Sequence, residues 1–161
     1  MKLGLIGKSL SHSFSKNYFE DKFDKERLEG FSYDLFELSD ISEFPSFIES
    51  NDLTGFNVTV PYKESVIPFL DELDETAEKI GAVNTVTVSI QDGLKTLKGY
   101  NTDVFGFTQS IKPFLKNTHE RALILGTGGA SKAVNFVLQN LGIETNFVSR
   151  NPSEGQLNYT D

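Results

Sequence analysis

The sequence predicts an α/β fold, with a mixed, mainly parallel sheet in its N-terminal part and the start of a second α/β unit behind it. Two observations carry this prediction. Strand-like and helix-like periodicities alternate along the chain, and a glycine-rich turn at residues 126–131 stands between an apolar run and a helical stripe. The length of 161 residues fits one ordinary domain or two small ones, and 38% hydrophobic residues are enough to build a sizeable core.

Short apolar or alternating segments mark the strands of the first unit. They are Lys2 to Gly7, Phe31 to Leu35, Phe56 to Val60, Val83 to Ile90 and Leu94 to Leu97. Helices are expected over residues 14–23, 41–48 and 63–79, where apolar side chains recur at helical spacing. The last helix is interrupted near Pro68 and Asp71. Pro61 is expected to end the third strand because proline has no N–H to donate.

The second unit is expected to begin at residue 102, so that residues 1–101 and 102–161 form two domains. Asp103 suits the N-cap position of a helix that runs to about Leu115. The elements expected after it are a strand at 122–125, a helix over 133–141 and a strand at 143–149. This order begins a parallel doubly wound sheet, which needs several more strands, so we expect the sequence to be a truncated part of a longer protein.

Composition narrows the classes of function. The formal net charge is −8 and no cluster of Lys and Arg is present, which argues against nucleic acid as a partner. The chain has no Cys, so disulfides, thiolate zinc sites and thiol nucleophiles are excluded. No apolar run is long enough for a signal peptide or a bilayer-spanning helix. We therefore expect a cytoplasmic protein with no membrane partner and no metal site.

The glycine-rich turn has the sequence context of a Rossmann-type, dinucleotide-binding element, with a strand before it and a helix and second strand after it. Gly126 and Gly128 allow the tight turn and the close approach of a pyrophosphate to the backbone. Gly129 follows, and a small residue, Ala130 or Ser131, takes the third position of the fingerprint. The alternative is an ordinary strand–helix turn.

The end of the following strand favours NADP as the cofactor. NAD sites usually place Asp or Glu there to bind the ribose 2′-hydroxyl, whereas this chain has Ser149 and Arg150. An arginine can hold a 2′-phosphate through paired hydrogen bonds. A solvated arginine in a loop is the alternative.

Polar residues on the third strand suggest a binding face. Asn57 and Thr59 alternate with apolar residues that include Val60, so both polar side chains are expected on the face opposite the apolar ones. The strand leads directly to Lys63, a cation at a helix start, where the helix dipole disfavours it. Solvent exposure is the simpler interpretation of each residue, and the mismatch at Lys63 favours a functional role.

Further polar residues stand at the ends of other elements. Ser13 and Ser15 alternate after the first strand, where hydroxyls either bind carboxylates or cap helices. Asn84 and Asp103 add an amide and a carboxylate at later element ends. Spacing alone does not bring Lys63 and Asp103 together.

Taken together, these segments resemble the shikimate dehydrogenase family. The matching stretches are Ser11-His12-Ser13-Phe14-Ser15, Asn57-Val58-Thr59-Val60-Pro61-Tyr62-Lys63, Gly81-Ala82-Val83-Asn84-Thr85, Asn101-Thr102-Asp103 and Gly126-Thr127-Gly128-Gly129-Ala130-Ser131. They occur in family order and span most of the chain, which makes the resemblance highly specific.

The resemblance implies an oxidoreductase that uses NADP to reduce 3-dehydroshikimate reversibly to shikimate, a step of aromatic amino-acid biosynthesis. It implies that Ser13 and Ser15 hold the substrate carboxylate with help from Thr59, and that Asn84 and Asp103 bind ring hydroxyls. Asn57 would belong to the same substrate site. Lys63, with Asp103, would serve the reacting oxygen as a catalytic acid/base pair.

Departures from the family pattern keep alternatives open. Glu154 stands where NADP-specific members often carry a second basic residue, so quinate/shikimate dehydrogenases that use NAD or both cofactors are alternatives. Family members also continue well past Asp161, and we expect this chain to be inactive by itself. A non-catalytic shikimate-binding module and a different NAD(P) enzyme are the remaining alternatives. Unpaired strand edges make a homodimer possible.

Overall fold

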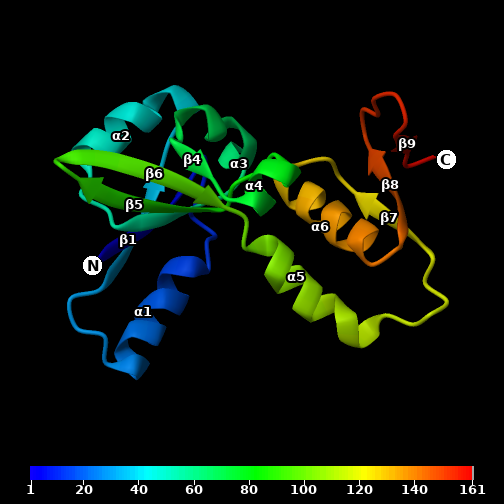
Figure 1. The fold of residues 1–161 in the computed structure, drawn as a ribbon, viewed down its shortest axis with the longest axis horizontal. Coiled ribbons are helices and arrows are strands. Elements are labelled where there is room, and N and C mark those ends of the chain that lie inside the picture. Colours follow the sequence, from blue (N-terminus) through cyan, green and yellow to red (C-terminus); the bar gives the residue numbers. More distant parts are fainter. Residues whose placement is uncertain (161) are drawn as a thin grey trace.

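The computed structural model describes residues 1–160, which form two sheets with helices packed around each (Figure 1). The N-terminal sheet has six strands in the order β2-β1-β3-β5-β6-β4. Its strands are β1 (Lys2–Gly7), β2 (Ser32–Glu37), β3 (Gly55–Val58), β4 (Glu72–Leu73), β5 (Thr85–Gln91) and β6 (Leu94–Tyr100). The β1–β2, β1–β3 and β4–β6 pairs are parallel, and β5 runs antiparallel to both β3 and β6. The mixed α/β architecture predicted from the sequence is therefore confirmed.

Both faces of this sheet are covered. Its helices are α1 (Ser15–Glu26), α2 (Phe44–Ser50), α3 (Tyr62–Ser65) and α4 (Glu75–Ile80), with 3-10 turns at Ile41–Glu43 and Ile67–Phe69. Successive strand residues face opposite sides, so Leu5 packs with Phe23 of α1 while Ile6 belongs to the larger cluster around Phe44 and Phe56. A central parallel strand buried on both faces is apolar throughout, which explains the uninterrupted apolar run of β1.

The second unit starts with α5 (Asp103–Ile111), which leads away from β6 and ends in a 3-10 turn at Lys112–Phe114 (Figure 1). Its remaining elements are β7 (Arg121–Leu125), α6 (Gly129–Asn140), β8 (Glu144–Ser149) and β9 (Leu157–Asn158). All three strands are parallel, in the order β7-β8-β9. Gly142 has a φ of +76° just past the end of α6, where its missing Cβ allows the left-handed conformation. No helix in residues 1–160 is both long and apolar enough to span a membrane.

Four details of the predicted elements were wrong. The strand β3 ends at Val58, and Val60 is 64% exposed, because the chain turns there and Tyr62 N donates to Thr59 O. The interruption predicted near Pro68 and Asp71 is present, but the edge strand β4, which follows it and pairs with β6, was not predicted. Asp103 is the first residue of α5, whose N-cap is Thr102. The second unit also contains a third strand, β9.

Candidate active site

The centre of the candidate site is an ion pair between the two units. Lys63 Nζ lies 2.7 Å from Asp103 Oδ2, and the side chains are 13% and 34% exposed, respectively. The other oxygen of the carboxylate, Oδ1, accepts a hydrogen bond of 2.7 Å from Asn84 Nδ2. Both oxygens of Asp103 are thus engaged, and the ammonium group of Lys63 is held in one place at partial burial.

The sheet topology brings these three side chains together. Asn84 immediately precedes β5 and Asp103 follows β6, and the antiparallel register pairs Thr85 with Tyr100, so the two residues lie at the same end of the hairpin. Asn84 N donates to Tyr100 O at 3.0 Å. Lys63 is fixed to the same place because its carbonyl oxygen accepts from Val83 N at 2.7 Å. The hairpin therefore brings Lys63 and Asp103 into contact. Their spacing in the sequence did not predict this contact.

Asn84 is a buried amide whose hydrogen-bonding groups are all used. It is 8% exposed, and its Oδ1 accepts from Thr102 N at 2.9 Å and from Thr85 Oγ1 at 3.0 Å. These donors fix the carbonyl end of the amide, so the Nδ2 end must face Asp103. A buried amide satisfied in this way holds a fixed orientation, because an unpaired polar group in its place would cost free energy.

A second amide, that of Asn57, connects this network to the middle of the sheet. Asn57 Nδ2 donates to Asn84 O at 3.3 Å and to Thr85 Oγ1 at 3.1 Å. Its Oδ1 accepts from the hydroxyl of Tyr33 at 2.8 Å. Burial raises the pKa of Tyr33 to about 12, while the Ser15 hydroxyl has a smaller effect in the opposite direction.

Tyr33, Thr85 and Thr102 were missing from the predicted site residues. Tyr33 lies in the alternating segment that was predicted as a strand, and its side chain is 2% exposed. The signal in the sequence that could have identified Tyr33 is its hydroxyl group. A buried tyrosine hydroxyl needs a hydrogen-bond partner, so a tyrosine predicted in the core predicts a polar neighbour as well.

The remaining substrate candidates lie at the same edge of the sheet. Ser13 and Ser15 follow β1, and Thr59 follows β3, which is the parallel neighbour of β1. The carboxyl ends of parallel strands share one edge, where ligands of open α/β sheets bind. Ser13 Oγ also accepts from Ser15 N at 3.2 Å, which supports the start of α1. Neither Ser13 nor Thr59 forms a hydrogen bond with the Lys63 side chain within residues 1–160, so the structure groups them by position along this edge.

The glycine-rich turn packs directly against Lys63. A Cβ placed on Gly129 would lie 2.9 Å from the Cβ of Lys63, closer than side-chain carbons approach one another. Only glycine therefore lets α6 begin at this position. Lys132 of α6 forms an ion pair with Glu64, the neighbour of Lys63, and Ala133 packs in one cluster with Ile80 and Ala82. The second unit thus brings its turn to the edge that carries the ion pair.

The turn and the end of β8 have the geometry of an anion-binding edge. Gly126 has a φ of +115°, which favours glycine. A Cβ on Gly128 would meet nothing within 4 Å, so the outer side of the turn is open. Ala130 is exposed, Ser149 Oγ accepts from Asn151 N at 3.2 Å, and Arg150 is exposed just past β8.

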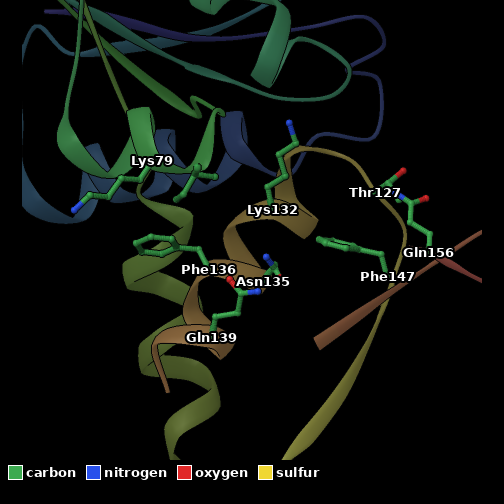
Figure 2. A pocket seen from close by; sticks show the side chains of 9 residues that line it. Lys79, Thr127, Lys132, Asn135, Phe136, Gln139, Phe147 and Gln156 are labelled. Atoms are coloured by element: carbon green, nitrogen blue, oxygen red, sulfur yellow. The ribbon is translucent and has the colours of Figure 1, made fainter. Parts of the chain in front are cut away.

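A separate cleft of about 280 Å³ lies between α4 and α6 and contains neither Lys63 nor Asp103 (Figure 2). Figure 2 shows Phe147 projecting from β8 toward α6, while Thr127 and Gln156 lie at the far wall. The candidate site is therefore defined by its hydrogen bonds and not by this cleft. No group of three or more metal-ligating side chains occurs within residues 1–160.

Fold and site together define an α/β protein of two units, with a buried polar network at their junction. The family model described as the shikimate dehydrogenase substrate binding domain matches residues 5–86. The chain belongs to the shikimate dehydrogenase family, which confirms the resemblance predicted from its motifs.

Curated relatives and solved structures agree with this assignment. The chain is 46% identical over 149 residues to a "Shikimate dehydrogenase (NADP(+))" of Oceanobacillus iheyensis, in an alignment that covers 88% of the chain and 52% of the relative. Shikimate dehydrogenase 1 from Peptoclostridium difficile superposes with a TM-score of 0.84 at 38% identity, over 97% of this chain and 57% of that one.

A Thermus thermophilus shikimate 5-dehydrogenase solved in complex with NADP(H) and shikimate superposes with a TM-score of 0.81 at 30% identity. This superposition covers 96% of the chain and 58% of the solved one. The chain thus spans about half to three fifths of the length of these three relatives.

Proposed function

We propose that this sequence belongs to an NADP-dependent shikimate dehydrogenase, an enzyme that reversibly reduces 3-dehydroshikimate to shikimate in aromatic amino-acid biosynthesis. The observation that carries the proposal is the Lys63–Asp103 pair, held by Asn84 beside the glycine-rich turn. Relatives named for this activity support the proposal, as does the neighbour solved with NADP(H) and shikimate.

In this proposal the substrate lies along the carboxyl edge of the first sheet. Ser13 and Ser15 donate hydroxyl hydrogen bonds to the substrate carboxylate, and Thr59 assists from the end of β3. Asn84 and Asp103 bind ring hydroxyls at the other end of the site, and Asn57 holds Asn84 through its backbone oxygen. A site of this kind recognises a small hydroxylated carboxylate because hydroxyls meet one end and an amide–carboxylate pair meets the other.

Lys63 performs the proton transfer in the proposed reaction. Its ammonium group donates a proton to the ketone oxygen as that oxygen becomes a hydroxyl, and the neutral amine takes the proton back in the reverse direction. Asp103, 2.7 Å away, stabilises the ammonium form and orients Nζ. When bound, the nicotinamide cofactor supplies or accepts the hydride.

The residues of the second unit fit a dinucleotide phosphate. The turn with Gly126, Gly128, Gly129 and Ala130 would bind the pyrophosphate at the N-terminus of α6, where backbone N–H groups are free. Ser149 and Arg150 would bind the 2′-phosphate of NADP. The open outer side of the turn and the exposure of Arg150 support this fit.

The proposal also assigns the domains and the setting. Residues 1–101 form the substrate domain, and residues 102–161 form the opening of the cofactor domain. The acidic composition supports a cytoplasmic setting. Within residues 1–160, β7 pairs on one side only. This open edge supports a homodimer of the isolated chain, and sedimentation that shows only monomer across a concentration series would exclude it.

The proposed function is tested by ligand-observed NMR with this chain and shikimate, with quinate as the comparison ligand. We expect selective binding of shikimate, and we expect the double variant Ser13→Ala, Lys63→Ala to lose it. NADP-linked turnover is then measured on the complete gene product that contains this sequence.

Three outcomes would revise the proposal. Equal binding of quinate would favour a quinate/shikimate enzyme. Shikimate binding without any NADP- or NAD-linked turnover by the complete gene product would favour a non-catalytic binding module. Absence of both binding and turnover would remove the proposed function.

A further inference from the structure

The loop between β1 and α1, residues 8–14, carries Ser13 and has a carboxylate bound to its backbone. Leu10 N donates a hydrogen bond of 2.6 Å to Oε1 of Glu37, the last residue of β2. In the parallel β1–β2 register Glu37 lies opposite Gly7, so its side chain reaches beyond the end of β1 to the loop. A carboxylate beside a loop that is proposed to bind an anion repels that anion. The presence of Glu37 at this position therefore needs an explanation.

Leu10 is the anchor of this loop. Its side chain is 3% exposed and packs in an apolar cluster with Leu5 and Phe23. Its N–H is bound by Glu37, and its carbonyl oxygen accepts from Ser13 N at 2.8 Å. The side chain, the N–H and the carbonyl group of Leu10 are thus all held, and Glu37 is the side chain that holds the N–H.

Packing on β1 places the anchored loop next to Thr59. A Cβ on Gly7 would lie 2.7 Å from Leu10 Cδ2 and 2.7 Å from Thr59 Cγ2. The side chains of Leu10 and Thr59 therefore both pack against Gly7, at the edge of the sheet where the proposed substrate residues lie.

The turn from Leu10 to Ser13 connects the anchor to the serine hydroxyl. Ser13 N is held by Leu10 O, and Ser13 Oγ accepts from Ser15 N at 3.2 Å. The bond from Ser15 N uses a lone pair of the Ser13 hydroxyl oxygen and leaves the hydroxyl hydrogen available for donation. The Ser13 hydroxyl is therefore oriented by the loop and is still able to donate to a carboxylate.

We infer that Glu37 is a positioning residue for Ser13: its carboxylate fixes Leu10, and the turn from Leu10 to Ser13 fixes the hydroxyl that binds the substrate carboxylate. The inference rests on the proposed function, because it takes shikimate as the ligand. Glu37 itself need not touch the substrate. A loop that is already held in its binding conformation loses less conformational entropy when the ligand binds, and this gain outweighs the repulsion between the two carboxylates.

The first test measures shikimate affinity in Glu37→Ala and in Asp71→Ala. Asp71 is a matched control, since it is also an exposed carboxylate and accepts a hydrogen bond of 2.7 Å from a distant backbone N–H, that of Leu97. Loss of the acceptor predicts that Glu37→Ala binds shikimate about threefold to tenfold more weakly than the unchanged chain. Asp71→Ala is expected to keep the unchanged affinity. Equal weakening in both variants would show a general loss of stability and would overturn the inference.

The second test separates positioning from charge by adding Glu37→Gln. This variant removes the negative charge but keeps a side-chain oxygen that accepts the Leu10 hydrogen bond, so we expect it to bind shikimate about as tightly as the unchanged chain. If Glu37 acted on the ligand only through its charge, both Glu37→Ala and Glu37→Gln would bind the shikimate anion more tightly. Tighter or unchanged binding by Glu37→Ala would therefore contradict the inference, as would equal weakening by the two Glu37 variants.

A ligand-free measurement separates the inference from the proposed function. The backbone amide resonances of Ser13 and Ser15 are recorded by NMR in the unchanged chain, in Glu37→Ala and in Asp71→Ala. We expect them to shift in Glu37→Ala and to stay in place in Asp71→Ala. If the unchanged chain does not bind shikimate, the proposed function fails, and shifted resonances would still show that Glu37 positions the loop. Unshifted Ser13 and Ser15 resonances in Glu37→Ala would overturn the inference whether or not shikimate binds.

Discussion

The Lys63–Asp103 network and the glycine-rich turn lie against each other at the junction of the two units, but they are built differently. In the network, the amide of Asn84 and both oxygens of Asp103 have partners from the protein itself. In the turn, the outer side of Gly128 is open and Arg150 is exposed. The network is thus organised before any ligand arrives, whereas the outer side of the turn is open to a ligand.

This difference teaches where preorganisation is needed. A proton transfer requires donor and acceptor within hydrogen-bond reach and in a fixed orientation. A pyrophosphate brings its own charge and can order an open turn by binding to it. We therefore expect substitutions in the network to affect chemistry, and substitutions in the turn to affect packing or cofactor affinity.

The largest expected effect is that of Lys63→Ala on turnover. Loss of the proton donor should lower kcat of the complete gene product by about 10²- to 10⁴-fold, while shikimate affinity changes far less. The measurement is kcat by steady-state kinetics together with Kd by calorimetry. Lys79→Ala is the control, because Lys79 is also paired with a carboxylate, Glu75, but lies on α4 away from the network. Equal losses in kcat and affinity would assign Lys63 to binding instead.

Part of this site follows from the sequence. The period-2 alternation around Asn57 and the apolar run of β1 depend on local patterns, and both correspond to strands. The turn between β5 and β6 also follows from a local pattern, because Asp92 and Gly93 take the positive φ values of 53° and 79° that Asp-Gly turns favour.

The rest depends on partners that are distant in the sequence. Asp103 was expected to cap α5, as a carboxylate at that position usually does. Its oxygens instead bind Lys63, 40 residues earlier, and Asn84, 19 residues earlier. The β5–β6 hairpin makes those distant groups neighbours. The part played by Tyr33 was missed for the same reason, because its partner lies 24 residues away on a strand that β1 separates from β2.

The next effect concerns stability at high pH and tests the contribution of the buried Tyr33 hydroxyl. The pKa of Tyr33 is raised to about 12 in the folded state, so the unfolded chain releases this proton at lower pH. The contribution of the Tyr33 hydroxyl to the free energy of unfolding is fully present below about pH 10 and is lost as the pH rises toward 12. A difference of about two between the folded and unfolded pKa values corresponds to about 3 kcal/mol in the free energy of unfolding. Urea unfolding between pH 8 and 12 should show that Tyr33→Phe loses less free energy of unfolding at alkaline pH than the unchanged chain does. If the free energy of unfolding falls equally with pH in both proteins, ionisation of Tyr33 does not contribute to the alkaline loss of stability.

A smaller effect tests the contact between the two regions. Gly129→Ala places a Cβ 2.9 Å from that of Lys63, so α6 must shift, with an expected loss of about 1–3 kcal/mol in the free energy of unfolding. Gly128→Ala is the matched control, because its Cβ would meet nothing within 4 Å. Denaturant unfolding of both variants decides the matter. Equal stability would show that α6 is not held against Lys63.

The smallest expected effect concerns the open region. Arg150→Ala should weaken NADP binding by about tenfold while NAD binding stays unchanged, since only NADP carries the 2′-phosphate that a guanidinium would hold. Arg121→Ala is the control, because Arg121 is exposed at the opposite, N-terminal end of β7. Calorimetric titration of both cofactors into the unchanged complete gene product and into each variant gives the affinities to be compared. If Arg150→Ala weakens both cofactors equally, Arg150 binds a group that they share, and the preference for NADP must then come from residues outside this edge.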